Sequence, residues 1–401
     1  MKRTDLKILM LLALLSAFPP LSTDMYLPAL PLLQQKWQQT MAAINLTLAG
    51  FFIGYCVSLL FYGPLSDKYG RRYPLLAGVS IYIIASLMCG ISTSAESLTV
   101  FRIIQGIGAA SGSVIAMAIT KDLYKSSERQ KILAYMGVIM ALAPMLAPII
   151  GGWIMTQLSW PWVFLFQALL GSIAWVGVYR LEEPIQERSE VSLLGTVGMY
   201  LELVRNRRYI ALVLLFSLVV FPHFSFIGSA ADTYIKRFGV SEQIFGFFFA
   251  LNALAIMAGS FSCARIQKYI QAREILTASF AGILVSGIVM FLGVIPGPWG
   301  LALPMAFASF SFGLSRPTSN HIILEQVDKG AGAASSFMIF IYFIMASFSM
   351  WFISIGWGDT IKTISVIAMF SGGSVLAIWL LLPCLTSSNR DTPCLGTTKN
   401  E

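Results

Sequence analysis

The sequence contains few charged residues and few of the residue types that build metal or disulfide sites. Only 11% of its 401 residues are charged, whereas soluble domains carry about 25%. It has two histidines, and its five cysteines show no C-x-x-C spacing, which argues against a metal centre and a disulfide framework. No pairing of a nucleophile with a base is evident. We therefore expect no soluble domain of useful size, no metal and no enzymatic activity.

Apolar residues make up 57% of the chain and are gathered into long runs. A helix needs about 20 residues to cross the hydrocarbon core of a bilayer. The first run has no small-x-small cleavage site before Asp24, so we expect an uncleaved helix rather than a signal peptide. The sequence predicts an all-α membrane protein with twelve transmembrane helices, at about residues 7–33, 43–63, 74–94, 97–121, 131–156, 161–181, 209–233, 243–264, 274–295, 298–324, 331–355 and 361–383.

A polar connector at residues 182–208 separates the first six predicted helices from the second six. The halves share weak similarities: a shift of 200 residues aligns 68–69 with 268–269, and a shift of 208 aligns 24–26 with 232–234. A duplicated six-helix unit around a midplane site would leave such matches. We expect two pseudo-symmetric halves at 1–181 and 209–383, a cytoplasmic linker at 182–208 and a cytoplasmic tail at 384–401.

Positive charge is distributed according to the predicted topology and is not collected in one patch. With the N-terminus inside, 21 of the 27 Lys and Arg lie on the cytoplasmic side, and four lie outside, namely Lys36, Lys236, Arg237 and Lys362. This bias follows the positive-inside rule and places both termini in the cytoplasm. The net charge of +8 therefore indicates contact with a lipid bilayer and not with nucleic acid.

The loop at residues 63–72 has an ordered pattern of turn-forming and charged residues. It reads Gly-Pro-Leu-Ser-Asp-Lys-Tyr-Gly-Arg-Arg. Gly63-Pro64 is expected to end one helix, and Gly70 permits the positive φ of a tight reversal. An ordinary positive-inside loop is the alternative. We expect a conformational gate formed by Gly63, Asp67, Gly70, Arg71, Arg72 and Asp122, in which Asp122 could pair with Arg71 or Arg72.

Asp24 is an acid in the outer part of the first predicted helix. An ionisable residue at membrane depth is costly and by default indicates function. Burial would favour its neutral form and let it take and release a proton. The alternative is an acid at the outer interface that faces water. Pro28 and Pro31 favour the first reading, because they predict a loosened helix end around a cavity.

Arg102 lies in the fourth predicted helix, just before the small residues 106–112. A guanidinium stays charged, so Arg102 must face a cavity or a partner. We expect it to act with Asp24 in proton coupling; a structural arginine bonded to backbone carbonyls is the alternative. We also place Tyr26, Gln105, Asp232 and Asn320 in the substrate cavity. His223 could face that cavity, but a packed histidine is the commoner case.

The fifth predicted helix contains Pro144, Pro148, Gly151 and Gly152. Two prolines and paired glycines bend a helix and thin one of its faces. This pattern resembles the motif that marks antiporters of the major facilitator superfamily, although Ala143 and Ala147 stand where that motif has glycines. The loop at 63–72 and the Arg102 segment resemble two further motifs of the same superfamily.

The string Thr23-Asp24-Met25-Tyr26-Leu27-Pro28, together with these motifs, resembles the Bcr/CflA branch of the drug:proton antiporters. The resemblance implies a monomeric exporter in the bacterial inner membrane that moves small molecules such as bicyclomycin or chloramphenicol-like compounds. It implies no cofactor, with protons as the coupling ion, and a gate that locks the cytoplasmic ends together. A dedicated exporter of a metabolite or siderophore, and a receptor or scaffold without transport, are the alternatives.

Overall fold

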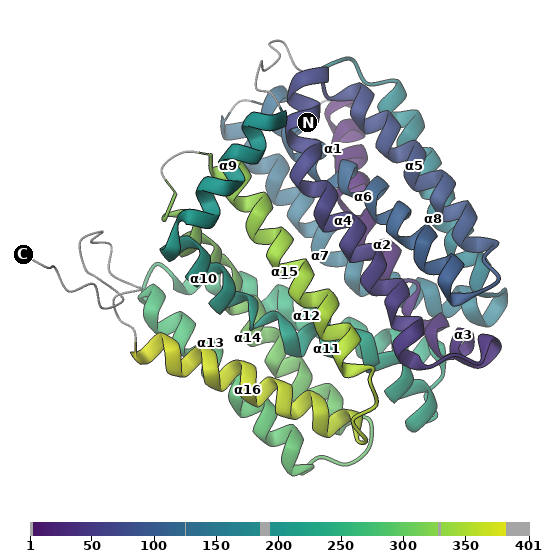
Figure 1. The fold of residues 1–401 in the computed structure, drawn as a ribbon, viewed down its shortest axis with the longest axis vertical. Coiled ribbons are helices and arrows are strands. Elements are labelled where there is room, and N and C mark those ends of the chain that lie inside the picture. The colour runs from purple at the N-terminus through teal and green to yellow at the C-terminus, as the bar shows by residue number, and fades with distance from the viewer. Residues whose placement is uncertain (1–2, 125, 185–192, 328–329, 382–401) are drawn as a thin grey trace, which may run out of the picture.

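The computed structural model describes residues 3–124, 126–184, 193–327 and 330–381, and every regular element in these ranges is helical (Figure 1). The elements are α1 (Arg3–Ser16), α2 (Phe18–Asp24), η1 (Leu27–Ala29), α3 (Leu30–Trp37), α4 (Met41–Tyr69), α5 (Arg72–Gly90), α6 (Ala95–Leu123), α7 (Ser126–Gln157), α8 (Trp160–Tyr179), α9 (Leu193–Arg205), α10 (Arg207–Ser217), α11 (Val220–Ala231), η2 (Asp232–Arg237), α12 (Glu242–Ile266), α13 (Ala272–Leu292), α14 (Trp299–Leu324), α15 (Ala331–Ile353) and α16 (Thr360–Leu381).

Ten helical spans in the described residues are long and apolar enough to cross a membrane, and a bent pair forms an eleventh. The bent pair is the first span, in which residues 6–16 and 18–37 meet at 46°. The remaining predicted segment is α14, a helix of 26 residues that packs along α12 and α13. The prediction of an all-α membrane protein is thereby confirmed.

The packing of the first six spans is repeated in the second six. In the first half, α4 and α5 pack on α6, and α5 packs on α8; in the second half, α12 and α13 pack on α14, and α13 packs on α16. The halves meet through two equivalent pairs, α4 with α15 and α7 with α12. This repetition confirms the predicted pair of pseudo-symmetric halves.

Glycines bring the repeated helix pairs equally close. A Cβ on Gly106 of α6 would lie 2.1 Å from the carbonyl oxygen of Phe51 in α4, and a Cβ on Gly313 of α14 would lie 2.1 Å from that of Ile256 in α12. Only glycine allows the backbones to approach this closely. The two halves therefore share their tightest crossing as well as their order of helices.

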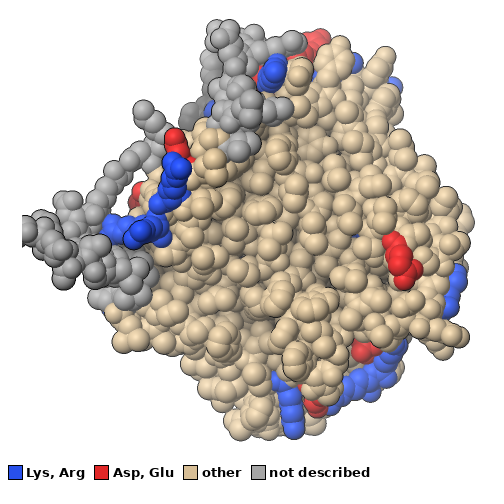
Figure 2. All heavy atoms as spheres, viewed as in Figure 1, with Lys and Arg blue, Asp and Glu red and all other residues tan. Residues whose placement is uncertain are grey.

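Figure 2 shows that, on the face drawn, charged side chains lie mostly towards two opposite ends, with a broad uncharged surface between them. We call the end where α1 begins the inner end, because the charge pattern predicts it to be cytoplasmic. The other end, which includes α3, is the outer end (Figure 1). The uncharged surface between them is suited to lipid.

The sequence predicted that the second span ends at Gly63-Pro64. This prediction was wrong, because α4 continues to Tyr69. Proline lacks the N–H that would donate to the carbonyl oxygen four residues earlier, at Leu60. The Tyr200 hydroxyl donates to that oxygen instead, at 2.9 Å. Tyr200 belongs to α9, a helix inside the predicted linker 182–208. The predicted tail at 384–401 lies outside the described residues.

Candidate functional site

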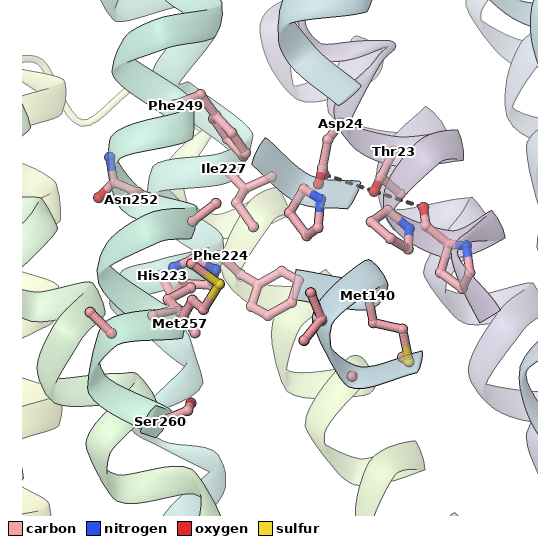
Figure 3. A pocket seen from close by; sticks show the side chains of 18 of the residues that line it. Thr23, Asp24, Met140, His223, Phe224, Ile227, Phe249, Asn252, Met257 and Ser260 are labelled. Carbon is pink, nitrogen blue, oxygen red and sulfur yellow. Dashed lines mark hydrogen bonds between the residues drawn. The ribbon is translucent and has the colours of Figure 1, made fainter. Parts of the chain in front are cut away.

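A pocket of about 810 Å³ lies between the two halves (Figure 3). We call it the central pocket. Its wall comes from the first span, α4 and α7 on one side and from α11, α12 and α15 on the other. Most of its lining residues are apolar or aromatic. The lining residues, polar ones included, comprise Pro19, Pro20, Thr23, Asp24, Phe52, Gly137, Met140, Pro144, His223, Phe224, Ile227, Phe249, Asn252, Met257, Ser260 and Phe343.

Asp24 is the one acid among the described residues that line the central pocket. Its side chain is nearly buried, with a relative exposure of 6%. The Thr23 hydroxyl donates to its Oδ1 at 2.9 Å and lies 3.0 Å from the carbonyl oxygen of Pro19. The helix ends at Asp24, and a 3₁₀ turn containing Pro28 begins at Leu27. The prolines thus interrupt the span beside the acid, as the sequence indicated.

Arg102 is completely buried inside the first half. Its Nη1 donates to the carbonyl oxygen of Ser22 at 3.0 Å and to Gln105 Oε1 at 2.5 Å. Its guanidinium also lies 4.5 Å from the ring centroid of Phe51 and 5.2 Å from that of Tyr26. Arg102 is not one of the described residues that line the central pocket. The structure connects it to the Asp24 segment through backbone and aromatic contacts.

Tyr26 and Gln105 belong to the same buried network and not to the central pocket. The Tyr26 hydroxyl lies 3.1 Å from Thr47 Oγ1. Gln105 donates from Nε2 to Gln167 Oε1 at 2.8 Å and to Ser86 Oγ at 2.7 Å. These bonds join the first span to α4, α5, α6 and α8. They satisfy polar groups that would otherwise be costly inside a bundle.

Asp232 and Asn320 lie at opposite ends of the second half. Asp232 begins η2 at the outer end and pairs with Lys236 at 3.2 Å. Asn320 lies near the inner end of α14, where its Oδ1 is 3.5 Å from the Tyr342 hydroxyl. Neither residue lines the central pocket in the described part of the chain. The four residues expected in the cavity are therefore placed elsewhere by the packing of their helices.

The predicted gate residues gather at the inner end of the first half. Arg71 donates from Nε to Asp122 Oδ2 at 2.8 Å and from Nη1 to Asp67. The Glu183 carboxylate accepts from the backbone N–H groups of Arg71 and Arg72, at 2.8 and 3.1 Å. Gly70, at a φ of +91°, makes the turn. Gly63 lies inside α4, and the Arg72 guanidinium packs on Tyr179 at 5.4 Å.

Helix α7 lies between the halves with its proline and glycine face inward. Pro144 lines the central pocket, and Pro148 is buried beside Gly246 of α12. A Cβ on Gly151 would lie 2.1 Å from the Met25 carbonyl oxygen, and one on Gly152 would lie 2.4 Å from that of Glu242. The paired glycines therefore let α7 touch both halves near the outer end.

Further contacts close the outer end. Asn45 of α4 donates from Nδ2 to the carbonyl oxygen of Gly228 at 2.6 Å and to Ser354 Oγ at 2.5 Å. Gln243 of α12 donates to Thr156 of α7 at 2.9 Å. The central pocket extends from Asp24 towards Gly137 and Ser260, in the inner halves of α7 and α12. The arrangement is that of a bundle closed outside, with its pocket towards the inside.

Asn45 was not singled out from the sequence, and His223 was noted there with a packed position as the commoner alternative. Both residues are neutral polar groups in apolar runs. In the sequence they look no different from the many serines and threonines of such helices.

In the described residues, no group of three or more His, Cys, Asp or Glu could hold a metal ion.

The chain matches the family model of the Major Facilitator Superfamily over residues 12–350. It is 27% identical to a bicyclomycin resistance protein homolog of Haemophilus influenzae, over 81% of this chain and 83% of the relative. It is 29% identical to the multidrug resistance protein MdtL of Klebsiella pneumoniae, over 79% and 80%. The crystal structure of a D-xylose–proton symporter, 14% identical, superposes with a TM-score of 0.73 over 93% of this chain and 97% of the other. That likeness shows the fold.

Proposed function

Because the chain belongs to the Major Facilitator Superfamily, we propose that it exports small, largely hydrophobic compounds across the bacterial inner membrane in exchange for protons. The observation that carries the proposal is the central pocket, which combines a mainly apolar wall with one nearly buried acid, Asp24. Apolar walls with a few polar groups are typical of sites for hydrophobic ligands. A lone acid at this depth provides a place for one proton.

In this account, Asp24 is the proton site and Arg102 supports it. Arg102 holds the Ser22 carbonyl group, two residues before Asp24, and so fixes the segment that presents the acid. Proton and substrate would each favour one of two rocked states of the halves, and exchange requires that each binds those states unequally. The contacts between the halves at the outer end, around Asn45 and Gly152, would break and reform in each cycle.

The names of the relatives support export of antibiotics. Proteins called bicyclomycin resistance homolog and multidrug resistance protein align with about four-fifths of the chain. We therefore include bicyclomycin and chloramphenicol-like compounds among the proposed substrates. We further propose that the protein acts as a monomer in the lipid bilayer with both termini in the cytoplasm.

A susceptibility panel in a host lacking its own efflux pumps tests the proposal. Expression of the wild-type protein should raise resistance to several unrelated hydrophobic antibiotics, and a protonophore should abolish dye efflux from the same cells. Glu96→Gln, which changes an exposed acid at the start of α6, is the matched control and should behave as wild type. Resistance to none of the compounds, or efflux insensitive to the protonophore, would contradict it.

A further inference from the structure

We propose that His223 recognises the substrate from the second half, and that it selects aromatic compounds carrying a hydrogen-bonding group. This inference rests on the proposed export function and extends it to the chemistry of the substrate. Figure 3 shows His223 on the wall of the central pocket, beside Phe224 and Met257 and across the pocket from the segment of Asp24. Of the described residues that line the pocket, it is the one basic side chain.

The His223 imidazole has a polar atom without a partner. Its Nδ1 is buried and makes no hydrogen bond to any described residue. A buried donor or acceptor left unpaired costs free energy, and a neutral imidazole offers one donor and one acceptor. A ligand that displaced the atoms covering Nδ1 and paired with it would recover that free energy, so the site favours ligands that can supply such a hydrogen-bonding atom.

Aromatic neighbours hold the imidazole ring in place. The Phe312 ring stacks on it with the centroids 5.2 Å apart and the planes 13° apart. The Phe224 ring meets it edge to face, at 5.5 Å and 89°. The Arg316 guanidinium lies 5.4 Å from the centroid of Phe312. A ring packed in this way loses little freedom when a ligand binds, which is the requirement for a selective contact.

The other polar side chains of the pocket already have partners. Asn252 donates to the Phe248 carbonyl oxygen and accepts from Ser309. Ser260 donates to the Gly313 carbonyl oxygen at 3.1 Å. Thr23 donates to Asp24, which the proposed mechanism uses for the proton. Recognition of a polar group on the substrate therefore falls to His223.

The rest of the lining determines the body of the substrate. Phe52, Phe224, Phe249 and Phe343 line the same pocket, and aromatic rings favour offset or edge-to-face contacts with another ring. A flat aromatic compound with one hydroxyl, amide or amine group at its edge matches this wall. A fully apolar compound of the same shape would fill the pocket but leave His223 unpaired.

Two ligands that differ only in this group provide the test. 4-Phenylphenol has a hydroxyl where 4-methylbiphenyl has a methyl group of similar size. In equilibrium dialysis of the purified full chain, with empty micelles as the blank, wild type should bind 4-phenylphenol about fivefold to tenfold more tightly. His223→Phe should bring the ratio close to one. His223→Asn, whose amide can reach the place of Nδ1, should keep part of the preference.

The second histidine of the chain supplies the matched control. His321 is exposed, with its Nε2 3.2 Å from Glu325 Oε1, and His321→Phe should leave the ratio unchanged. A ratio unchanged in His223→Phe overturns the assignment of His223 and leaves the export proposal standing. Failure of the wild-type protein to bind either ligand contradicts both.

A second measurement does not depend on the folding of His223→Phe. In His321→Asn, purified without a histidine tag, His223 is the sole histidine, so its carbethoxylation by diethyl pyrocarbonate can be followed alone. 4-Phenylphenol should slow the reaction severalfold more than 4-methylbiphenyl at equal occupancy. Equal protection by the two ligands overturns the proposed hydrogen bond.

Discussion

Arg102 donates a hydrogen bond from Nη1 to the carbonyl oxygen of Ser22 at 3.0 Å, and this bond connects it to the Asp24 segment. The Asp24 carboxylate receives its own hydrogen bond from Thr23. The arginine therefore acts on the acid through the conformation of residues 22–24. We call it a positioning residue for this reason.

Replacing Arg102 by alanine should destabilise the first half. Gln105 Oε1 would lose its 2.5 Å donor, and a buried acceptor left unpaired costs about 1–3 kcal/mol. We expect a clearly lower melting temperature in detergent and slower transport at every pH. Arg316→Ala is the control, because the Arg316 guanidinium lies against aromatic rings, 3.9 and 5.4 Å from their centroids, and the residue is partly exposed. Equal melting temperatures for Arg102→Ala and wild type would refute this role.

Removing the Asn45 side chain should open the outer end. Its Nδ2 bonds Gly228 and Ser354 of the other half, and each hydrogen bond contributes about 1 kcal/mol, so the ratio of outward-open to outward-closed molecules should rise roughly fivefold or more. Distances between spin labels at Gln35 and Lys362 in Asn45→Ala measure this ratio. Asn206→Ala, which breaks a bond between the linker region and Gln326, should leave the distances unchanged. A distribution like that of wild type in Asn45→Ala would show that the contact does not hold the halves.

Changing the gate should slow transport of all substrates alike. Asp67 accepts from Arg71, which also bonds Asp122, at the inner end and away from the residues of the central pocket. Asp67→Asn should therefore reduce transport rates of different compounds by a similar factor. Lys68→Gln, at the next residue of α4, is the control. A new order of preference among substrates, at unchanged turnover, would be inconsistent with a gating role.

The outer ion pair between Arg237 and Asp359 should be insensitive to physiological pH. Hydrogen bonds from Arg237, at 2.7 and 3.0 Å, lower the pKa of Asp359 to about 2. A lowered pKa contributes stability that is present above the ordinary Asp pKa, near 4, and is lost as the pH falls towards 2. Because both side chains are partly exposed, Asp359→Asn should cost at most about 1 kcal/mol. Unfolding curves in detergent should show the same cost at pH 5 and pH 8, and a cost that changed between them would contradict the pairing.

The helices could be predicted because the length of an apolar run sets the length of a span. Residues 97–121 were expected, for example, and α6 covers Ala95–Leu123. Whether a proline ends a helix depends on whether the carbonyl oxygen that it leaves without a donor finds another hydrogen-bond partner. Pro64 does not end α4, since Tyr200 supplies a donor from a helix far along the chain.

The site could be predicted where a charge or a helix-bending proline interrupts an apolar run. Asp24 and Pro144 line the central pocket, and Arg71 pairs with Asp122. Composition does not determine which way a side chain faces around its helix. Tyr26 is two residues from Asp24, and residues two apart point to different sides of a helix, so it is buried inside the first half and does not line the pocket. Asn45 and neutral His223 carry no charge. The apolar sequence around each of them therefore did not distinguish a pocket or interface position from ordinary packing.

The most direct test of the account is proton-driven transport by Asp24→Asn. Wild-type protein and the variant would be reconstituted in liposomes with the compound to which the wild-type protein gives the greatest resistance. An imposed pH gradient should drive wild type to accumulate the compound, and the gradient should have no such effect on Asp24→Asn, although the variant should still bind the compound. Gradient-driven accumulation by Asp24→Asn at the wild-type rate would show that the proton is carried elsewhere.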